Sequence, residues 1–317
     1  MSAPLRIFVM YGGGASSGLG LATGPKHAKT YEVVGAGTNN SSASGTQGFR
    51  DLGIDTVTPV DVLDLDYEGF CEISGLDPKK KDSGKRYHEM WMNVIEPFKP
   101  DAIALSGYFK ILSPEFLQQC NETWNVHPAA LYWVAPAQKR GDETAVHRKL
   151  YNFATSDPAD VAYWMKVDEL ERTFKGESAV FDALLNSHDP DRRLTEIRAT
   201  VHRATEEVDA GPIEVVSPAV QIDRDRVGHF LRNRNYDQLQ EYADALQEIL
   251  KNKGDVPAYL AAVELRAEGS SRLEERTVEG RVKVDNGGII TEELIDIPYW
   301  RFIADGKEMP YGGLQMW

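Results

Sequence analysis

The chain has 317 residues, of which 42% are hydrophobic, which is enough for a sizeable core in one large domain or two modest ones. Its 35 basic and 49 acidic residues give a net charge of -14. This balance disfavours a general electrostatic attraction to nucleic acid or to an anionic membrane, so neither is expected as a partner, and an anionic ligand would need a local site.

The cysteine content and the N-terminus predict a cytoplasmic protein. Cys71 and Cys120 are its two cysteines, which argues against a disulfide framework and fits a reducing compartment. The first residues lead into an apolar run without the successive regions of a signal peptide. Nowhere do about 18 apolar residues follow one another, so no spanning helix is expected.

Apolar runs alternate with amphipathic stretches along the first half, which is typical of a parallel sheet covered by helices. Strands are expected at Leu5–Met10, Tyr31–Gly35, Ala102–Ser106 and Thr123–His127, and helices at Phe49–Gly53 and Tyr87–Phe98. Pro100 ends the second helix. Because an open parallel sheet binds ligands beyond the carboxyl ends of its strands, we expect the site there.

The composition changes at residues 133–175, where Trp and Tyr are scattered among charges, and this predicts a partly helical insertion. It separates an N-terminal Rossmann-like part, 1–132, from the remainder of the domain, 176–317. In that remainder we expect a helix at Asn235–Asn252 and strands at Ile197–Val201 and Val215–Ile222. A helix at 176–185 and short hairpin strands at Gly280–Val284 and Asp305–Pro310 are implied by the family resemblance given below. The predicted fold class is α/β: an open, mostly parallel Rossmann-like sheet flanked by helices, with a helical insertion and a small C-terminal hairpin region.

A glycine-rich loop follows the first expected strand and opens a helix. Glycines let backbone N–H groups approach an anion closely, and the start of a helix favours negative charge. We predict that a phosphate group of the substrate binds at Gly12, Gly13, Gly14, Ala15, Ser16 and Ser17. The alternative is that these glycines only make a tight turn.

The same loop, with Gly14, Gly18 and Gly20, also resembles the cofactor turn of short-chain dehydrogenases. That class needs a Tyr followed four positions later by Lys. None of the 13 tyrosines has a Lys at that spacing, and Tyr163 has Lys166 one position short. The chain therefore lacks the acid–base pair of a dehydrogenase. A dinucleotide-binding protein without that chemistry remains an alternative interpretation.

Asn125 and His127 are two positions apart in an expected strand, so their side chains share one face. A carboxamide N–H can stabilise a developing oxyanion and an imidazole can manage a proton, as acyl transfer to an amine requires. Asp209, in the loop before Gly211, supplies a carboxylate that would favour a protonated His127. The structural alternatives are a histidine that satisfies hydrogen bonds at a strand end and a carboxylate that caps a turn.

Two segments, Asn125-Val126-His127-Pro128 and Glu206-Glu207-Val208-Asp209-Ala210-Gly211-Pro212, with Val201-His202 between them, resemble in order the motifs of the folate-dependent formyltransferases. The likeness is greatest to the glycinamide ribonucleotide formyltransferases. Phe109 to Pro114 is similar to a further segment of that family, which receives the pterin ring. The match spans residues 5–131 and 176–222, with a weaker echo in the last forty.

The resemblance implies an enzyme that transfers a formyl group from 10-formyltetrahydrofolate to the amine of a phosphorylated small molecule. Glycinamide ribonucleotide, an intermediate of purine biosynthesis, is the expected acceptor. It implies that Asn125, His127 and Asp209 are catalytic. It places the folate at Phe109, Lys110, Leu112, Thr205, Glu206, Val208, Ala210 and Gly211.

The chain departs from the family on the acceptor side. Ala129-Ala130 and the insertion follow the histidine motif where the family has Ser-Leu-Leu-Pro, and Gly12 to Ser16 differs from its Gly-x-Gly-Ser-Asn. Another amine, such as an amino sugar nucleotide, water in a deformylase, or a ligand-binding protein without catalysis therefore remain alternatives. No metal is expected, because the histidines lack ligand spacing, and the sequence leaves a homodimer open.

Overall fold

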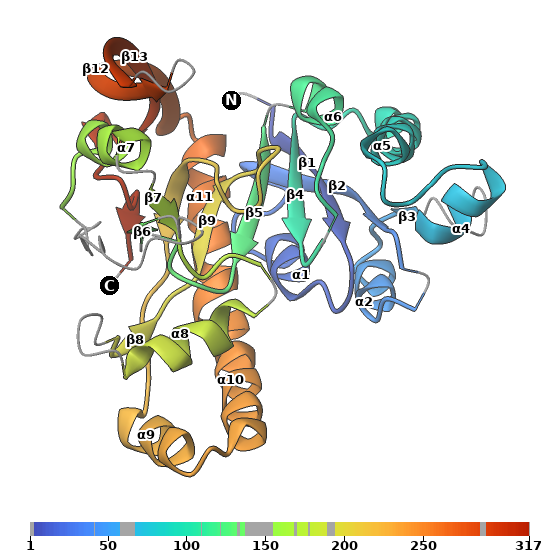
Figure 1. Ribbon diagram of the computed structural model, residues 1–317. Coiled ribbons are helices and arrows are strands. Elements are labelled where there is room, and N and C mark those ends of the chain that lie inside the picture. The colour runs from blue at the N-terminus through green and yellow to red at the C-terminus, as the bar shows by residue number, and fades with distance from the viewer. Residues whose placement is uncertain are drawn as a thin grey trace.

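A central sheet of eight strands, in the order β15-β10-β9-β5-β4-β1-β2-β3, organises the molecule (Figure 1). The computed structural model describes residues 3–40, 42–57, 67–108, 110–120, 122–131, 134–136, 155–167, 170–176, 178–188, 194–285 and 290–316. The strands of this sheet are β1 (Leu5–Tyr11), β2 (Tyr31–Thr38), β3 (Thr56–Val57), β4 (Ala102–Ser106), β5 (Thr123–His127), β9 (Thr200–Arg203), β10 (Ile213–Val216) and β15 (Leu314–Gln315). Strands β1 to β5 pair in parallel, and β9 is antiparallel to both of its neighbours. The α/β class with a mostly parallel sheet is therefore confirmed.

The two faces of the sheet carry separate cores because successive side chains of a strand point to opposite faces. Ile7 and Val9 of β1 belong to one core, and Phe8 and Met10 belong to the other. The first face is covered by α1 (Ser16–Ala22), α8 (Ala179–Ser187), α10 (Tyr236–Leu250) and α11 (Val256–Ala267), and the second by α5 (Lys81–Ile95) and α6 (Pro114–Gln119). Helices thus flank the sheet on both sides, as expected.

The remaining helices lie around this frame. They are α2 (Gly45–Asp51), α4 (Tyr67–Ile73), the 3-10 turn η1 (Glu96–Phe98), α7 (Pro158–Val167), α9 (Arg224–Arg232) and the π-helical turn η2 (Lys251–Asp255), which joins α10 to α11. The helix expected at Phe49–Gly53 begins earlier, at Gly45, and ends before Gly53, whose φ of 72° is left-handed. The sequence did not predict α9 and α11.

Two expected strands are each divided between two sheets. Residues 197–201 fall into β8 (Glu196–Ile197) and β9, and residues 215–222 into β10 and β11 (Val220–Gln221). β8 pairs with β11 in a small sheet of its own. Pro218 lies at the second break, where it offers no backbone N–H to continue a ladder.

The C-terminal hairpin is longer than expected and has a different partner strand. Strand β12 (Ser271–Asp285) pairs along its whole length with β13 (Ile290–Ala304). Residues 280–284 therefore pair within this hairpin and not with residues 305–310. Asp305 and Gly306, with φ of 49° and 72°, form a tight turn into the short strand β14 (Lys307–Glu308).

The described part of the insertion packs beside this hairpin. It comprises β6 (Val134–Pro136), α7 and β7 (Leu170–Arg172), with β6 and β7 paired antiparallel. Helix α7 lies next to β12 and β13 at one end of the molecule (Figure 1). Its helical content agrees with the expectation, and β7 leads the chain back toward the central sheet.

Candidate active site

A pocket of about 790 Å³ opens at the carboxyl edge of the parallel strands. The loop after β1, the segment after β4 and the end of β5 meet there, because Tyr11 is in register with Ser106 and Leu105 with Asn125. Loop residues before β10 and the C-terminal end of α10 complete the walls. The volume lies within the range of about 300–1,000 Å³ that is usual for small-molecule sites.

Most of the residues predicted for the site line this pocket. They are Gly13, Gly14, Ala15, Ser16, Ser17, Lys110, Leu112, Asn125, His127, Thr205, Val208 and Asp209. Gly12, Glu206, Ala210 and Gly211 are not among its lining residues. Phe109 lies outside the described residues.

The glycine loop is anchored to the sheet through serine side chains. The Ser17 and Ser106 hydroxyl oxygens are 2.6 Å apart, and the Gly18 N–H donates to Ser106 at 3.1 Å. A Cβ on Gly18 would come within 2.6 Å of Val9, so glycine allows α1 to approach β1 this closely. The Ser17 hydroxyl thus holds the loop in place, and the loop backbone from Gly13 to Ser16 faces the pocket.

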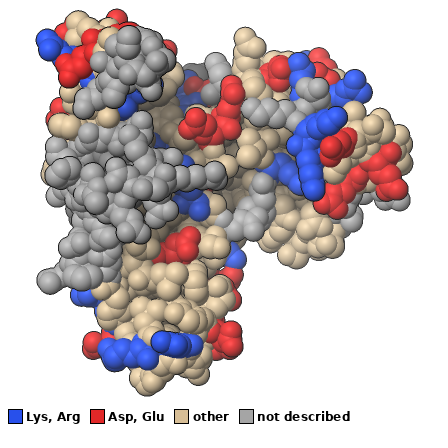
Figure 2. Space-filling model, in the orientation of Figure 1, with Lys and Arg blue, Asp and Glu red and all other residues tan. Residues whose placement is uncertain are grey.

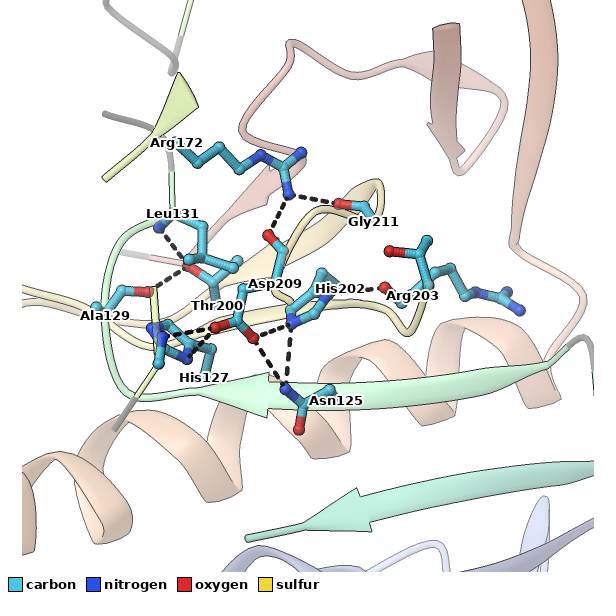
Figure 3. A network of polar contacts seen from close by, with 12 residues as sticks. Asn125, His127, Ala129, Leu131, Arg172, Thr200, His202, Arg203, Asp209 and Gly211 are labelled. Atoms are coloured by element: carbon cyan, nitrogen blue, oxygen red, sulfur yellow. Dashed lines mark hydrogen bonds and ion pairs between the residues drawn. The ribbon is translucent and has the colours of Figure 1, made fainter. Parts of the chain in front are cut away.

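Asn125, His202 and Asp209 form a compact polar triangle (Figure 3). The Asn125 amide nitrogen lies 3.2 Å from His202 Nε2 and 3.4 Å from Asp209 Oδ1, and those two atoms are 3.4 Å from each other. The three distances are nearly equal, so the two atoms lie in clearly different directions from the nitrogen. Asn125 lines the pocket and its side-chain nitrogen carries two N–H groups, so it can also donate to an oxygen there.

His127 is held between two oxygen atoms. Its Nδ1 lies 3.3 Å from Asp209 Oδ2, and its Nε2 lies 2.6 Å from the Phe174 carbonyl oxygen. That carbonyl can only accept, which assigns the proton of the neutral ring to Nε2 and leaves the Nδ1 lone pair beside Asp209. Protonation of Nδ1 would give the Asp209 carboxylate a hydrogen bond.

Burial lowers the pKa of His127 below its ordinary value, because its side chain is only 5% exposed. The Asp209 charge and the Phe174 carbonyl raise this pKa, and burial outweighs them. The expected preference of Asp209 for a charged ring is thus present, but the neutral ring is favoured near neutral pH. A neutral imidazole beside a carboxylate is suited to accept a proton.

Asp209 stands in a strained position from which its carboxylate reaches four neighbours, Asn125, His127, His202 and Gly176. Its φ is 52°, in the left-handed region, and Oδ2 accepts the Gly176 N–H at 2.9 Å. Burial would raise the pKa of Asp209, but the hydrogen bond with His202 and the charge on protonated His127 outweigh it and hold this pKa below its ordinary value. The carboxylate is therefore ionised across the physiological range.

Three further residues of this region were not predicted as site residues. His202 faces Asn125 across the β5–β9 pair, and Arg172 donates to the Asp209 loop. Asp255, at the end of η2, lines the pocket while 7% exposed, and its Oδ1 has no hydrogen-bond partner among the described residues. Burial raises the pKa of Asp255 to about 7. The Val-His dipeptide was a signal for His202, whereas a lone Arg in a charged run and a lone Asp after a helix give none.

The basic cluster of residues 79–81 lies at the start of α5. Figure 2 shows charges of both signs over this face, with Lys and Arg gathered on the right, where α5 begins. Lys110 connects this region to the pocket, because it lines the pocket and its Nζ lies 4.5 Å from the centre of the Tyr67 ring. Lys110 thus brings a positive charge to the wall of a pocket that Glu207 and Glu248 also line.

No three His, Cys, Asp or Glu side chains among the described residues are placed to hold a metal ion. No helix in that part of the chain is long and apolar enough to cross a membrane.

Comparison with known structures identifies the fold. Phosphoribosylglycinamide formyltransferase from Anaplasma phagocytophilum superposes with a TM-score of 0.55 at 16% identity, over 99% of this chain and 100% of that one. The enzyme from Coxiella burnetii gives 0.52 at 15% identity, over 99% of both chains. Glycinamide ribonucleotide transformylase 1 from Symbiobacterium toebii gives 0.51 at 19% identity, over 92% of this chain and 95% of that one. The chain therefore has the formyltransferase fold.

No protein-family model matches the chain, and no curated protein sequence matches it.

Proposed function

We propose that this protein transfers a formyl group from 10-formyltetrahydrofolate to the amine of a phosphorylated small molecule, with glycinamide ribonucleotide as the first acceptor to test. The observation that carries the proposal is the joining of Asn125, His127 and Asp209 at the wall of one pocket. The formyltransferase fold and the motif resemblance support it. The site is taken to lie in a cytoplasmic enzyme of purine biosynthesis that uses no metal.

The donor side of the pocket suits a flat, partly apolar ring. Ile111 and Val208 line it while 60% and 43% exposed, so they offer apolar surface to a ligand. The backbone near Lys110 and Thr205 adds polar groups at the same wall. Apolar surface with a few fixed polar groups is the usual composition of such a site.

Asn125, His127 and Asp209 have separate roles in the proposed transfer. The amine nitrogen bonds to the formyl carbon, the bond from that carbon to the carrier nitrogen breaks, and one proton passes from the amine to the carrier nitrogen. An N–H of Asn125 donates to the oxygen that gains negative charge. The neutral His127 accepts the amine proton at Nδ1, where the ionised Asp209 stabilises the resulting cation and Phe174 accepts from Nε2. The imidazolium then gives this proton to the carrier nitrogen and returns to its neutral form.

The acceptor side has the glycine loop at one end and Asp255 near it. The backbone N–H groups of residues 13–16 would bind the phosphate group, and Asp255 Oδ1, which has no partner among the described residues, can accept a hydrogen bond from the same substrate. Both features belong to the pocket that holds the triangle. A substrate with a phosphate and a hydroxyl or amine donor fits them.

The test is a spectrophotometric assay for loss of the formyl group from 10-formyltetrahydrofolate. It is run with glycinamide ribonucleotide, with other amines including an amino sugar nucleotide, and with no amine. Turnover that depends on glycinamide ribonucleotide is the expected result. Turnover with another amine only would replace the acceptor, turnover without amine would make water the acceptor, and silence in all arms would overturn the proposal.

A further inference from the structure

Residues 172–176, at the end of the insertion and just after it, contact His127 or the loop that carries Asp209 at alternate positions. Arg172 donates to the loop that carries Asp209, the Phe174 carbonyl accepts from His127, and the Gly176 N–H donates to the Asp209 carboxylate. Of these three residues only Gly176 lines the pocket. The segment therefore acts on the triangle from the side away from the substrate.

Arg172 forms the strongest of these connections. It is 7% exposed, and its Nη1 donates to the Asp209 carbonyl at 2.9 Å and to the Gly211 carbonyl at 2.6 Å (Figure 3). Hydrogen bonds from a charged group are stronger than those between neutral groups. One guanidinium nitrogen thus fixes both ends of a three-residue turn.

The backbone of this turn has an uncommon conformation, which its surroundings must hold in place. Asp209 has a left-handed φ of 52°, and a Cβ on Gly211 would lie 1.9 Å from the Arg203 carbonyl oxygen, so the backbone is packed tightly there. A non-glycine residue in this region persists only when its surroundings hold it. The Arg172 guanidinium is part of those surroundings.

Arg172 is itself held by the C-terminal part of the chain. Its Nε donates to the Tyr311 hydroxyl at 2.7 Å, and its guanidinium carbon lies 5.3 Å from the centre of that ring. The Tyr311 N–H in turn donates to the Ser156 carbonyl at 3.0 Å, before α7. The guanidinium therefore has a fixed place between the tail and the Asp209 turn.

We propose that Arg172 is a positioning residue, which holds the Asp209 turn so that the carboxylate faces His127. On this view the insertion supports catalysis through its last strand, β7. Only the kinetic test of this inference rests on the proposed function, because the His127 pKa reports the position of the Asp209 carboxylate without any turnover.

The experiment compares Arg172→Met and Arg172→Lys with a matched control, Arg198→Met. Arg198 is also 7% exposed and also donates to two backbone carbonyls, those of Ser217 and Met316, but it does not line the pocket. Loss of either guanidinium leaves two carbonyls without these donors, so both Met variants should lower the melting temperature. Only Arg172→Met should affect the triangle.

Two readouts separate positioning from stability. In Arg172→Met, kcat should fall by about a hundredfold, the usual effect of a small misplacement of a catalytic group, with KM for the formyl donor near its wild-type value. The imidazole pKa of His127, followed by NMR titration and assigned with His127→Asn, should be lower than in the wild type because the ring loses its carboxylate partner. Arg172→Lys should recover part of both values, and Arg198→Met should leave both unchanged.

Wild-type kcat and His127 pKa in folded Arg172→Met would overturn the proposal, as would an equal loss of kcat in Arg198→Met. If Arg172→Met does not fold, Arg172→Lys decides by the same two readouts. If the wild-type protein transfers no formyl group, the proposed function fails, but the His127 titration still tests whether Arg172 positions Asp209.

Discussion

Replacement of Asp209 by Asn tests the catalytic assignment most directly. Asn tolerates the left-handed backbone at this position and can still accept the Gly176 N–H, so the variant should keep the fold. What it loses is the negative charge 3.3 Å from His127 Nδ1. That charge stabilises the imidazolium that forms when the ring accepts the amine proton.

The size of the loss follows from the distance. Two unit charges this close attract one another by roughly 5 kcal/mol at an effective dielectric constant of about 20. Since each 1.4 kcal/mol or so is a factor of ten in rate, and since Asn retains part of the hydrogen bonding, we expect kcat to fall by about three powers of ten.

The assay is loss of the formyl group from 10-formyltetrahydrofolate with the acceptor at saturation. Donor binding, measured by isothermal titration, should be largely intact, as it should be in His127→Ala. Circular dichroism and intact mass serve as controls for folding and for reversion of Asn to Asp. A folded Asp209→Asn protein that keeps more than about a tenth of wild-type kcat would refute the assigned role.

Three further substitutions test single features of the site. Asn125→Ala should lower kcat by about a hundredfold to a thousandfold with little change in KM, because it removes an oxyanion donor; a change confined to KM would contradict that role. Asp255→Asn should raise the free energy of unfolding by up to about 4 kcal/mol near pH 8. Burial raises the Asp255 pKa to about 7 in the folded protein from roughly 3.9 in the unfolded chain, so the ionised carboxylate destabilises the folded state near pH 8. This destabilisation disappears below about pH 4, where the carboxyl group is protonated in both states. Urea denaturation showing the same gain at both pH values would disprove this. Gly211→Ala should lower the free energy of unfolding by about 3 kcal/mol or more, because the new Cβ meets backbone, whereas the control Gly84→Ala, with open space around it, should not.

Local patterns in the sequence were sufficient to predict the sheet and much of the site. Strand β4 begins and ends where its apolar run does, because buried parallel strands carry continuous apolar sequence. The two-residue spacing of Asn125 and His127 places both on the face that meets His202 and Asp209. The alternation of side chains along a strand and the sequence motifs predicted these features because each depends on residues that are close together in the chain.

Features that depend on distant contacts were not predictable in this way. Arg172 acts through carbonyls 37 and 39 residues away, and nothing in the charged run around it indicates burial. The long hairpin was underestimated because its strands carry many charges and pack against α7 on one side. Asp255 follows a helix that was expected to end at Asn252, and the π-helical turn that carries it into the pocket has no distinct sequence signal.

The antiparallel pairing of β5 with β9 has a consequence for how activity is acquired. Asn125 is in register with His202 and His127 with Thr200, across 77 and 73 positions of chain. Because a shift of one residue would turn a strand's side chains to the opposite face, no partly aligned form of this pair contains the triangle. Contacts between such distant positions form late, since the intervening chain must first be closed into a loop. Recovery of turnover during refolding should therefore lag behind the recovery of helical signal, and turnover would report the completion of the central sheet.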